Sequence, residues 1–296
     1  EKWSFKSEVE LEHNFVNDGE GELELEQAYV NYHSEKFGFQ GGVILPSIGL
    51  LNEYHEPPLF LSVERPLYNK YVIPTTWFGN GFAMYGKFLN INWRIALMED
   101  LKGEEVGNGI RSARGKGYET TGYDLLKNFS ISYNGYSGLK IGASISMNNA
   151  PVSIGNDGQV SSSIGITLSE FNTKYNANNI FSVFEYGIIN YDNSNYDNPD
   201  TEEIEEFNYG NTSGYYFDLG YNIGNIIGCN KLIPWFRMSN VSRDTNNEDK
   251  ITDLTRFGLT WWPIDQVAFK ADFGSIQIKS NSKPTTEFNI GIGYNF

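Results

Sequence analysis

The feature that most constrains this chain is a strict alternation of large apolar residues with small or polar ones. At the end of the sequence, in 287–296, Phe288, Ile290 and Ile292 occupy every second position, and between them stand amides and glycines. A period of two residues is the pattern of a β-strand whose two faces meet different surroundings. Ten residues of unbroken alternation therefore predict a long strand with one apolar and one polar face.

The same alternation recurs along the whole chain, and no helical period of comparable length accompanies it. It predicts about fourteen strands, at roughly 2–13, 22–32, 36–46, 76–88, 91–98, 126–134, 138–148, 161–169, 179–189, 213–223, 230–239, 251–262, 265–276 and 286–296. We therefore predict an all-β, antiparallel fold in a single domain over 1–296.

The lengths of the connections separate two all-β architectures. Tight turns alternate with long segments, which we expect to be external loops at 47–75, 99–125, 149–160 and 190–212. Soluble sandwiches have strands of about five or six residues and no such asymmetry. A transmembrane barrel needs strands of about 9–11 residues, with short turns at one end and long loops at the other. The pattern favours the transmembrane barrel, and a large soluble sandwich or propeller is the alternative.

Composition agrees with a water-lined barrel. The mean hydropathy is −0.42, and no apolar run approaches the ~18 residues of a membrane-spanning helix. The chain has 37 acidic and 22 basic side chains, which disfavours nucleic acid as a partner, because binding to phosphates rewards clustered bases. The alternation starts near residue 2 without a leader segment, so we expect a processed or trimmed form. A missing N-terminal hairpin would raise the predicted count to 16 strands.

Several segments of the first half resemble a known family. They are 41–58 (GGVILPSIGLLNEYHEPP), 63–66 (VERP) and 73–77 (IPTTW), supported by 23–30 (LELEQAYV) and 109–117 (GIRSARGKG). Together they resemble the phosphate-selective porin O/P family of Gram-negative outer membranes, over about the first 150 residues.

This resemblance implies a passive outer-membrane channel, often trimeric, in a barrel of typically sixteen strands. Its surroundings would be outer-membrane lipid and lipopolysaccharide, and its cargo small hydrophilic solutes or ions. The chain departs from the family in its fourteen predicted strands and in the absence of the family's N-terminal portion. A non-conducting structural barrel within a larger envelope complex is the alternative function, with the apolar segment 47–75 as its docking surface.

Charged residues on the predicted inner faces and loops are the candidate site. Arg111, Arg114 and Lys116 lie among glycines, where they would guide anions at a constriction or form a solvated basic loop. Lumen-lining bases are expected at Arg94, Lys140, Arg237, Arg256 and Lys270, and lumen-lining acids at Glu8, Glu10, Glu12, Glu22, Glu24 and Glu26. Facing walls of opposite charge would set up a transverse field; pairing between neighbours, such as Lys270 with Asp272, is the simpler alternative. The glutamates would repel phosphate, so we expect a weakly selective channel with local anion affinity.

The loop 47–75 is too apolar to remain exposed, so we expect it to pack inside the barrel mouth or against a neighbouring subunit. The sequence offers few residues for catalysis. Its only histidines are His13, His33 and His55, and the sequence places no serine near them. A single cysteine, Cys229, excludes an internal disulfide. We therefore expect no enzyme, no catalytic residue, no metal site and no cofactor.

Overall fold

A computed structural model describes residues 2–17, 20–53, 55–118, 121–154, 159–194, 207 and 209–295. Its strands are β1 (Trp3–Asn17), β2 (Glu20–His33), β3 (Phe37–Ile44), β4 (Gly79–Phe88), β5 (Ile91–Met98), β6 (Leu126–Tyr136), β7 (Leu139–Ile154), β8 (Val160–Ala177), β9 (Ile180–Asp192), β10 (Thr212–Tyr221), β11 (Leu232–Ser242), β12 (Ile251–Ile264), β13 (Val267–Ile278) and β14 (Thr285–Tyr294). Five short helical segments join them: η1 (Pro57–Leu59), α1 (Tyr68–Tyr71), η2 (Gly103–Glu105), α2 (Gly224–Ile227) and η3 (Glu248–Lys250). None of the helices in the described part is long and apolar enough to cross a membrane.

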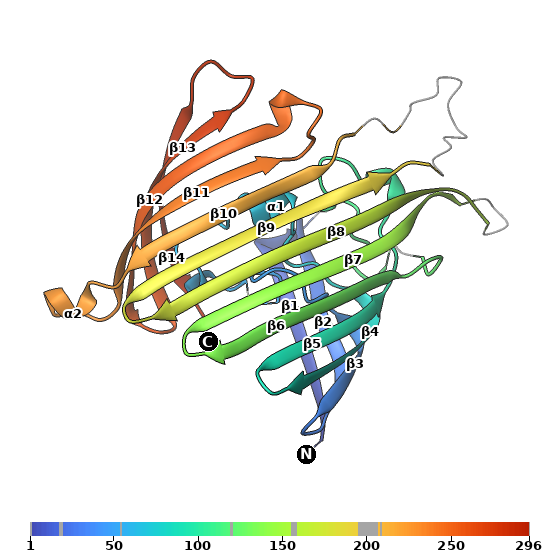
Figure 1. The fold of residues 1–296 in the computed structure, drawn as a ribbon, viewed down its shortest axis with the longest axis horizontal. Helices are drawn as coiled ribbons and strands as arrows, with labels where there is room; N and C mark the ends of the chain where they lie inside the picture. The colour runs from blue at the N-terminus through green and yellow to red at the C-terminus, as the bar shows by residue number, and fades with distance from the viewer. Residues whose placement is uncertain are drawn as a thin grey trace.

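The strands form one antiparallel sheet of 14 strands in sequence order, from β1 to β14. The predicted all-β fold and the predicted strand count are therefore confirmed. Figure 1 shows the long, tilted strands of the sheet curving around an interior that contains helix α1. Among the described residues β1 and β14 are not hydrogen-bonded to each other, so the curl leaves the two edges of the sheet unjoined.

The two faces of the sheet differ as the alternation predicts. On β14 the outward Phe288, Ile290 and Ile292 are 65%, 72% and 64% exposed. On the neighbouring β13 the inward Lys270 and Asp272 are buried. An apolar outside and a polar inside are the arrangement that a lipid environment stabilises.

The long connections lie at one end of the strands, with one difference from the sequence-based expectation. Residues 149–160 were expected to form an external loop, but β7 continues to Ile154 and β8 begins at Val160. The ladder between these strands continues through Asn149, which pairs with Gly165. The hairpin therefore rises beyond its neighbours because its cross-strand pairing continues as far as Ile154 and Val160, with shifts of register after Pro151.

The connection between β3 and β4, residues 45–78, fills the interior, and we call it the inner loop. Ile48, Leu61 and Ile73 in it are almost completely buried, and helix α1 packs against β10 and β11. The apolar residues of 47–75 thus lie inside the barrel, which was one of the two expected locations. The inner loop supplies much of the apolar core, since a barrel of this width leaves room for it.

Candidate functional site

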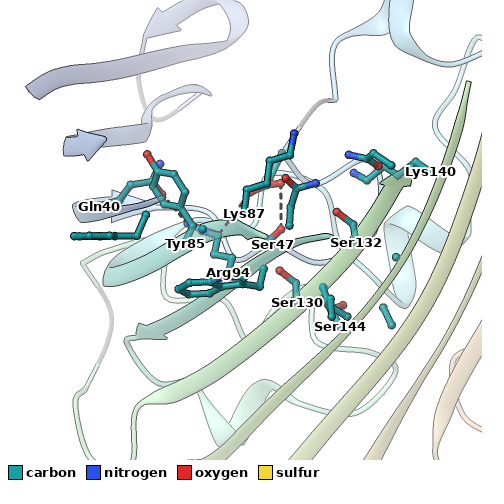
Figure 2. A pocket seen from close by; sticks show the side chains of 18 of the residues that line it. Gln40, Ser47, Tyr85, Lys87, Arg94, Ser130, Ser132, Lys140 and Ser144 are labelled. Carbon is teal, nitrogen blue, oxygen red and sulfur yellow. Dashed lines mark hydrogen bonds and ion pairs between the residues drawn. The ribbon is translucent and has the colours of Figure 1, made fainter. Parts of the chain in front are cut away.

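Three adjoining cavities run through the interior beside the inner loop. The first, about 550 Å³, lies near the short turns and is lined from β3 to β8. Figure 2 shows Gln40, Tyr85 and Arg94 on one side of this cavity, and a group of serines with Lys140 on the other. The serines, Ser130, Ser132 and Ser144, come from the inward faces of β6 and β7.

The other two cavities continue from the first through shared residues. A second cavity of about 210 Å³ shares Lys140 with the first. A third, of about 500 Å³, shares Phe60 and Arg237 with the second and contains Arg111 in its lining. Lys140 therefore lines the first two cavities, and Arg237, whose guanidinium is paired with Asp218, lines the second and the third.

On the wall formed by β4–β7, which we call the open wall, basic groups face the first cavity. Arg94 on β5 donates to the backbone oxygen of Leu45 at 2.6 Å and to Oε1 of Gln40 at 2.9 Å. Lys87 and Lys140 line the same cavity, and Lys87 is exposed. Lys87 and Lys140 on the open wall therefore face a cavity that water can fill.

The wall formed by β10–β13, which we call the sealed wall, uses its charges differently. Nζ of Lys270 donates to the backbone oxygens of Pro57, Phe60 and Ser62 at 2.5, 2.8 and 2.8 Å. All three ammonium donors of this side chain thus bind carbonyl oxygens of the inner loop. The predicted pairing of Lys270 with Asp272 is replaced by these contacts, because Asp272 accepts from the backbone nitrogen of Val63 at 2.7 Å instead.

Ion pairs of Arg237 with Asp218 and of Arg256 with Asp272 and Glu287 complete the sealed wall. The guanidinium of Arg237, which is 2% exposed, binds both carboxylate oxygens of Asp218 at 2.6 Å and donates to the hydroxyl of Ser62 at 2.7 Å. Arg256 donates to Oδ1 of Asp272 at 2.9 Å. These bidentate and shared contacts fix the side chains in place.

The three predicted anion-guiding residues lie in different surroundings. Arg111 is exposed and lines the third cavity. Arg114 is buried, and its guanidinium donates to the backbone oxygens of Arg111, Thr75 and Thr76 at 2.8, 2.9 and 2.8 Å. Lys116 pairs with Glu24 on β2. The structure therefore places Arg111 alone of the three against a described cavity, and the guiding role of all three stays a prediction.

The predicted acids gather on β1 and β2. Glu10 pairs in register with Glu24, and Glu26 is 1% exposed. The side chains of Glu12 and Glu22 lie outside the described residues. The charge of Arg65 in the inner loop acts on these acids: burial lowers the pKa of Arg65, while the charges of Glu10 and Glu26 oppose this change.

Two buried glutamates that were not predicted from the sequence bind backbone groups in the first turn of the inner loop. Glu185 on β9 is completely buried and accepts from the backbone nitrogen of Leu50 at 2.9 Å and from the Tyr216 hydroxyl at 3.2 Å. Glu170 on β8 accepts from Ser144 at 2.9 Å. Their inward positions follow from the period of two, but their contact with the loop depends on how the loop folds back.

The described histidines form no serine-based catalytic group. Nδ1 of His33 lies 3.3 Å from the Tyr85 hydroxyl, and Nδ1 of His55 lies 3.3 Å from the backbone oxygen of Asn52. The side chain of His13 lies outside the described residues.

Comparisons with known proteins place the fold among porins. No protein-family model matches the chain. A sequence relative, an uncharacterized protein of Aquifex aeolicus (strain VF5), is 39% identical over 151 residues, which is 49% of this chain and 35% of that protein. The match thus spans about a third of the relative's length.

Solved structures extend the likeness to almost the whole chain. A loop-deletion mutant of OmpT, an outer membrane protein of Vibrio cholerae, is similar with a TM-score of 0.60, 11% identity and coverage of 99% of this chain and 85% of that one. The outer membrane channel DcaP of Acinetobacter baumannii is similar with a TM-score of 0.60, 10% identity and coverage of 99% of this chain and 80% of that one. An anion-selective porin from Comamonas acidovorans is similar with a TM-score of 0.59, 10% identity and coverage of 91% of this chain and 77% of that one. The chain therefore has the fold of Gram-negative outer-membrane porin barrels.

Proposed function

We propose that this protein is an outer-membrane channel for passive diffusion of small hydrophilic solutes or ions, with a preference for anions. The observation that carries the proposal is the set of three interior cavities that share lining residues, with Lys140 between the first and the second. A solute that passes from the first cavity to the second meets Lys140, whereas Arg237, in the lining of the second and third, is already paired with Asp218. Positive side chains at a constriction attract anions and lower the barrier to their passage.

The third cavity supports the anion preference most directly. Of the charged residues in its lining, Arg237 and Arg256 are paired with Asp218, Asp272 and Glu287, which leaves Arg65, Lys70 and Arg111 against Glu64. The first cavity is closer to balance, with Lys36, Lys87, Arg94 and Lys140 against Glu35, Glu53 and Glu170. The net charge of −15 therefore does not set the sign of the field along the path.

The proposal includes the surroundings and the assembly. The exposed apolar residues of the strands would contact outer-membrane lipid, with lipopolysaccharide around the long loops. A homotrimer is supported by the fold alone: one similar structure is an in-vitro folded OmpT of Vibrio cholerae in its trimer form, with a TM-score of 0.56 and 10% identity.

Membership of the phosphate-selective porin O/P family is the finer part of the proposal. It rests on the segments 41–58, 63–66 and 73–77, most of which form the inner loop. Phosphate selectivity does not follow, because Arg237 is already paired with Asp218 and Lys270 already binds loop carbonyls. We propose a general affinity for small anions.

Planar-bilayer recordings in a KCl gradient test this function. Wild-type protein should open ion-conducting channels whose reversal potential shows a preference for chloride. Lys140→Glu should shift the permeability ratio toward potassium by about fivefold or more, since one unit charge at about 4 Å in water contributes about 1 kcal/mol.

Lys279→Glu is the matched control, because Lys279 pairs with Glu248 in the outer loops and lines none of the described cavities. A folded wild-type protein that never conducts would contradict the channel and favour the structural subunit. An unchanged reversal potential in Lys140→Glu would contradict the anion preference alone.

A further inference from the structure

The inner loop meets the β1–β2 hairpin at a β-bulge. Glu8 of β1 is opposite Gln27 of β2, and Val9 is opposite Leu25, so Glu26 is an extra residue with no partner in the ladder. Bulges redirect a side chain relative to the regular alternation. Here Glu26 and Gln27, although consecutive, are both buried, at 1% and 6% exposed.

His55 of the inner loop faces the redirected carboxylate. Its Nε2 lies 3.4 Å from Oε2 of Glu26, and its Nδ1 lies 3.3 Å from the backbone oxygen of Asn52. Donation of the Nδ1 proton to a backbone carbonyl is the usual way in which a metal-binding histidine is oriented, and it leaves the Nε2 lone pair free. That lone pair points at a carboxylate oxygen.

The 3.4 Å separation limits the ways in which these atoms can be joined. A charge-assisted N–H···O bond is about 2.7–2.9 Å long, which is shorter than the observed distance. Two ligands bound tetrahedrally at about 2.0–2.1 Å from one Zn²⁺ ion lie about 3.3–3.4 Å apart. The spacing therefore fits two ligands of a common metal ion, and it equally fits an ion pair between His55 and Glu26 when no metal is bound.

An unsatisfied buried oxygen gives independent support. Oε1 of Glu26 is buried and has no hydrogen-bond partner, and leaving a buried carboxylate oxygen unpaired is costly. One oxygen of Glu8, one of Glu26 and one nitrogen of His55 all lie within 4.8 Å of one another. Glu10 and Glu24 form a second group of this size around the same Glu26.

We propose that Glu8, Glu26 and His55 bind a divalent transition-metal ion such as Zn²⁺, which fastens the inner loop to the β1–β2 hairpin. This replaces the expectation from sequence that the chain has no metal site. An imidazole with carboxylates suits Zn²⁺ and its neighbours, whereas Ca²⁺ and Mg²⁺ prefer oxygen ligands only. The site lies outside the three cavities and does not depend on the proposed channel function.

Charges around the site leave room for a cation. Lys6 lies 3.6 Å from Glu8 with half of its side chain exposed, and Lys116 binds Glu24. Neither of these ion pairs involves Glu26; the positive charge that acts on both Glu26 and His55 is that of Arg65, which the surrounding Glu8, Glu10 and Glu24 offset. A small cavity of about 140 Å³, lined by Lys6 and Gln27, gives solvent a way to approach from the Glu8 side.

Isothermal titration with Zn²⁺ tests the site on the full chain, folded in detergent, without a histidine tag and after removal of trace metals. We expect one tightly bound ion per chain, and at least tenfold weaker binding in His55→Ala and in Glu26→Gln. His33→Ala is the matched control, because His33 lies at a short turn and contacts Tyr85. It should leave the affinity unchanged within twofold.

Co²⁺ substitution supplies a second readout, which reports the geometry of the site already in the wild-type protein. A tetrahedral site gives strong visible absorption, which should be present in wild type and His33→Ala and lost in His55→Gln. The proposal is overturned if Zn²⁺ does not bind, or binds equally in all variants that retain wild-type circular dichroism. Equal affinity for Zn²⁺ and Ca²⁺ with no effect of His55→Ala would indicate a carboxylate site and would also overturn it.

Discussion

The open wall and the sealed wall of the barrel carry similar inward bases but use them in opposite ways. On the open wall Lys87 and Lys140 face the first cavity. On the sealed wall Lys270 and Arg237 are buried against the inner loop and bind its oxygen atoms. The difference lies in where the inner loop runs, because the loop covers the sealed wall with its segment 57–63.

A lumenal charge is therefore available to solutes only where the loop leaves it uncovered. Where the inner loop covers a lysine or an arginine, that side chain packs against the loop and binds its oxygen atoms. Breaking contacts on the sealed wall should cost stability, and changing bases on the open wall should alter selectivity.

The largest effect is expected at the buried pair of the sealed wall. Asp218→Ala leaves Arg237 buried without its carboxylate, which typically costs about 3–5 kcal/mol in the free energy of unfolding. Urea unfolding in detergent, followed by tryptophan fluorescence, measures this cost. Asp265→Ala at an exposed turn is the control and should change stability by less than about 0.5 kcal/mol. A cost below about 1 kcal/mol for Asp218→Ala would show that the pair does not hold the loop.

A smaller loss is expected when the lysine under the loop is removed. Lys270→Met deprives three loop carbonyls of a charged donor, which should cost about 1.5–3 kcal/mol. The segment 57–63 should become cleavable by added protease, and single-channel conductance should rise as the loop detaches. Lys140→Met, which removes a lysine from the open wall, should leave the protease pattern as in wild type. Protection of 57–63 in Lys270→Met would contradict the anchoring role.

Much of the fold followed from the sequence because a two-faced strand has a strong local pattern. The fourteen strands and the inward positions of Arg94, Lys140 and Lys270 come from the period of two. Whether each of these side chains faces a cavity or binds the inner loop could not be predicted from the sequence. This depends on contacts between residues about 200 positions apart, such as Lys270 with Pro57. The proposed metal site could not be predicted for a related reason: the alternation does not predict the bulge at Glu26, and Glu26 meets His55 only because the inner loop folds inward.

The long-loop end offers a comparison between two neighbouring arginines. Arg114→Ala removes donors from buried loop carbonyls and should cost about 1–3 kcal/mol in stability. Arg111→Ala affects an exposed side chain and should cost less than about 0.5 kcal/mol, while it lowers the preference for chloride. Unfolding curves and reversal potentials of both variants separate the two effects. A selectivity change as large in Arg114→Ala as in Arg111→Ala, in channels with intact loops, would contradict this division.

The smallest effect is expected at Lys87, the exposed base of the open wall. Lys87→Ala should leave stability within about 0.5 kcal/mol of wild type and should shift the reversal potential less than Lys140→Glu does. Its influence should also depend on salt, because the screening length falls from about 10 Å at 0.1 M to about 3 Å at 1 M. Reversal potentials measured in KCl gradients around these two concentrations should differ between Lys87→Ala and wild type only at the lower one. A shift of equal size at 1 M would mean that Lys87 touches the permeating ion directly, and the first cavity would then be narrower at this point than an open vestibule.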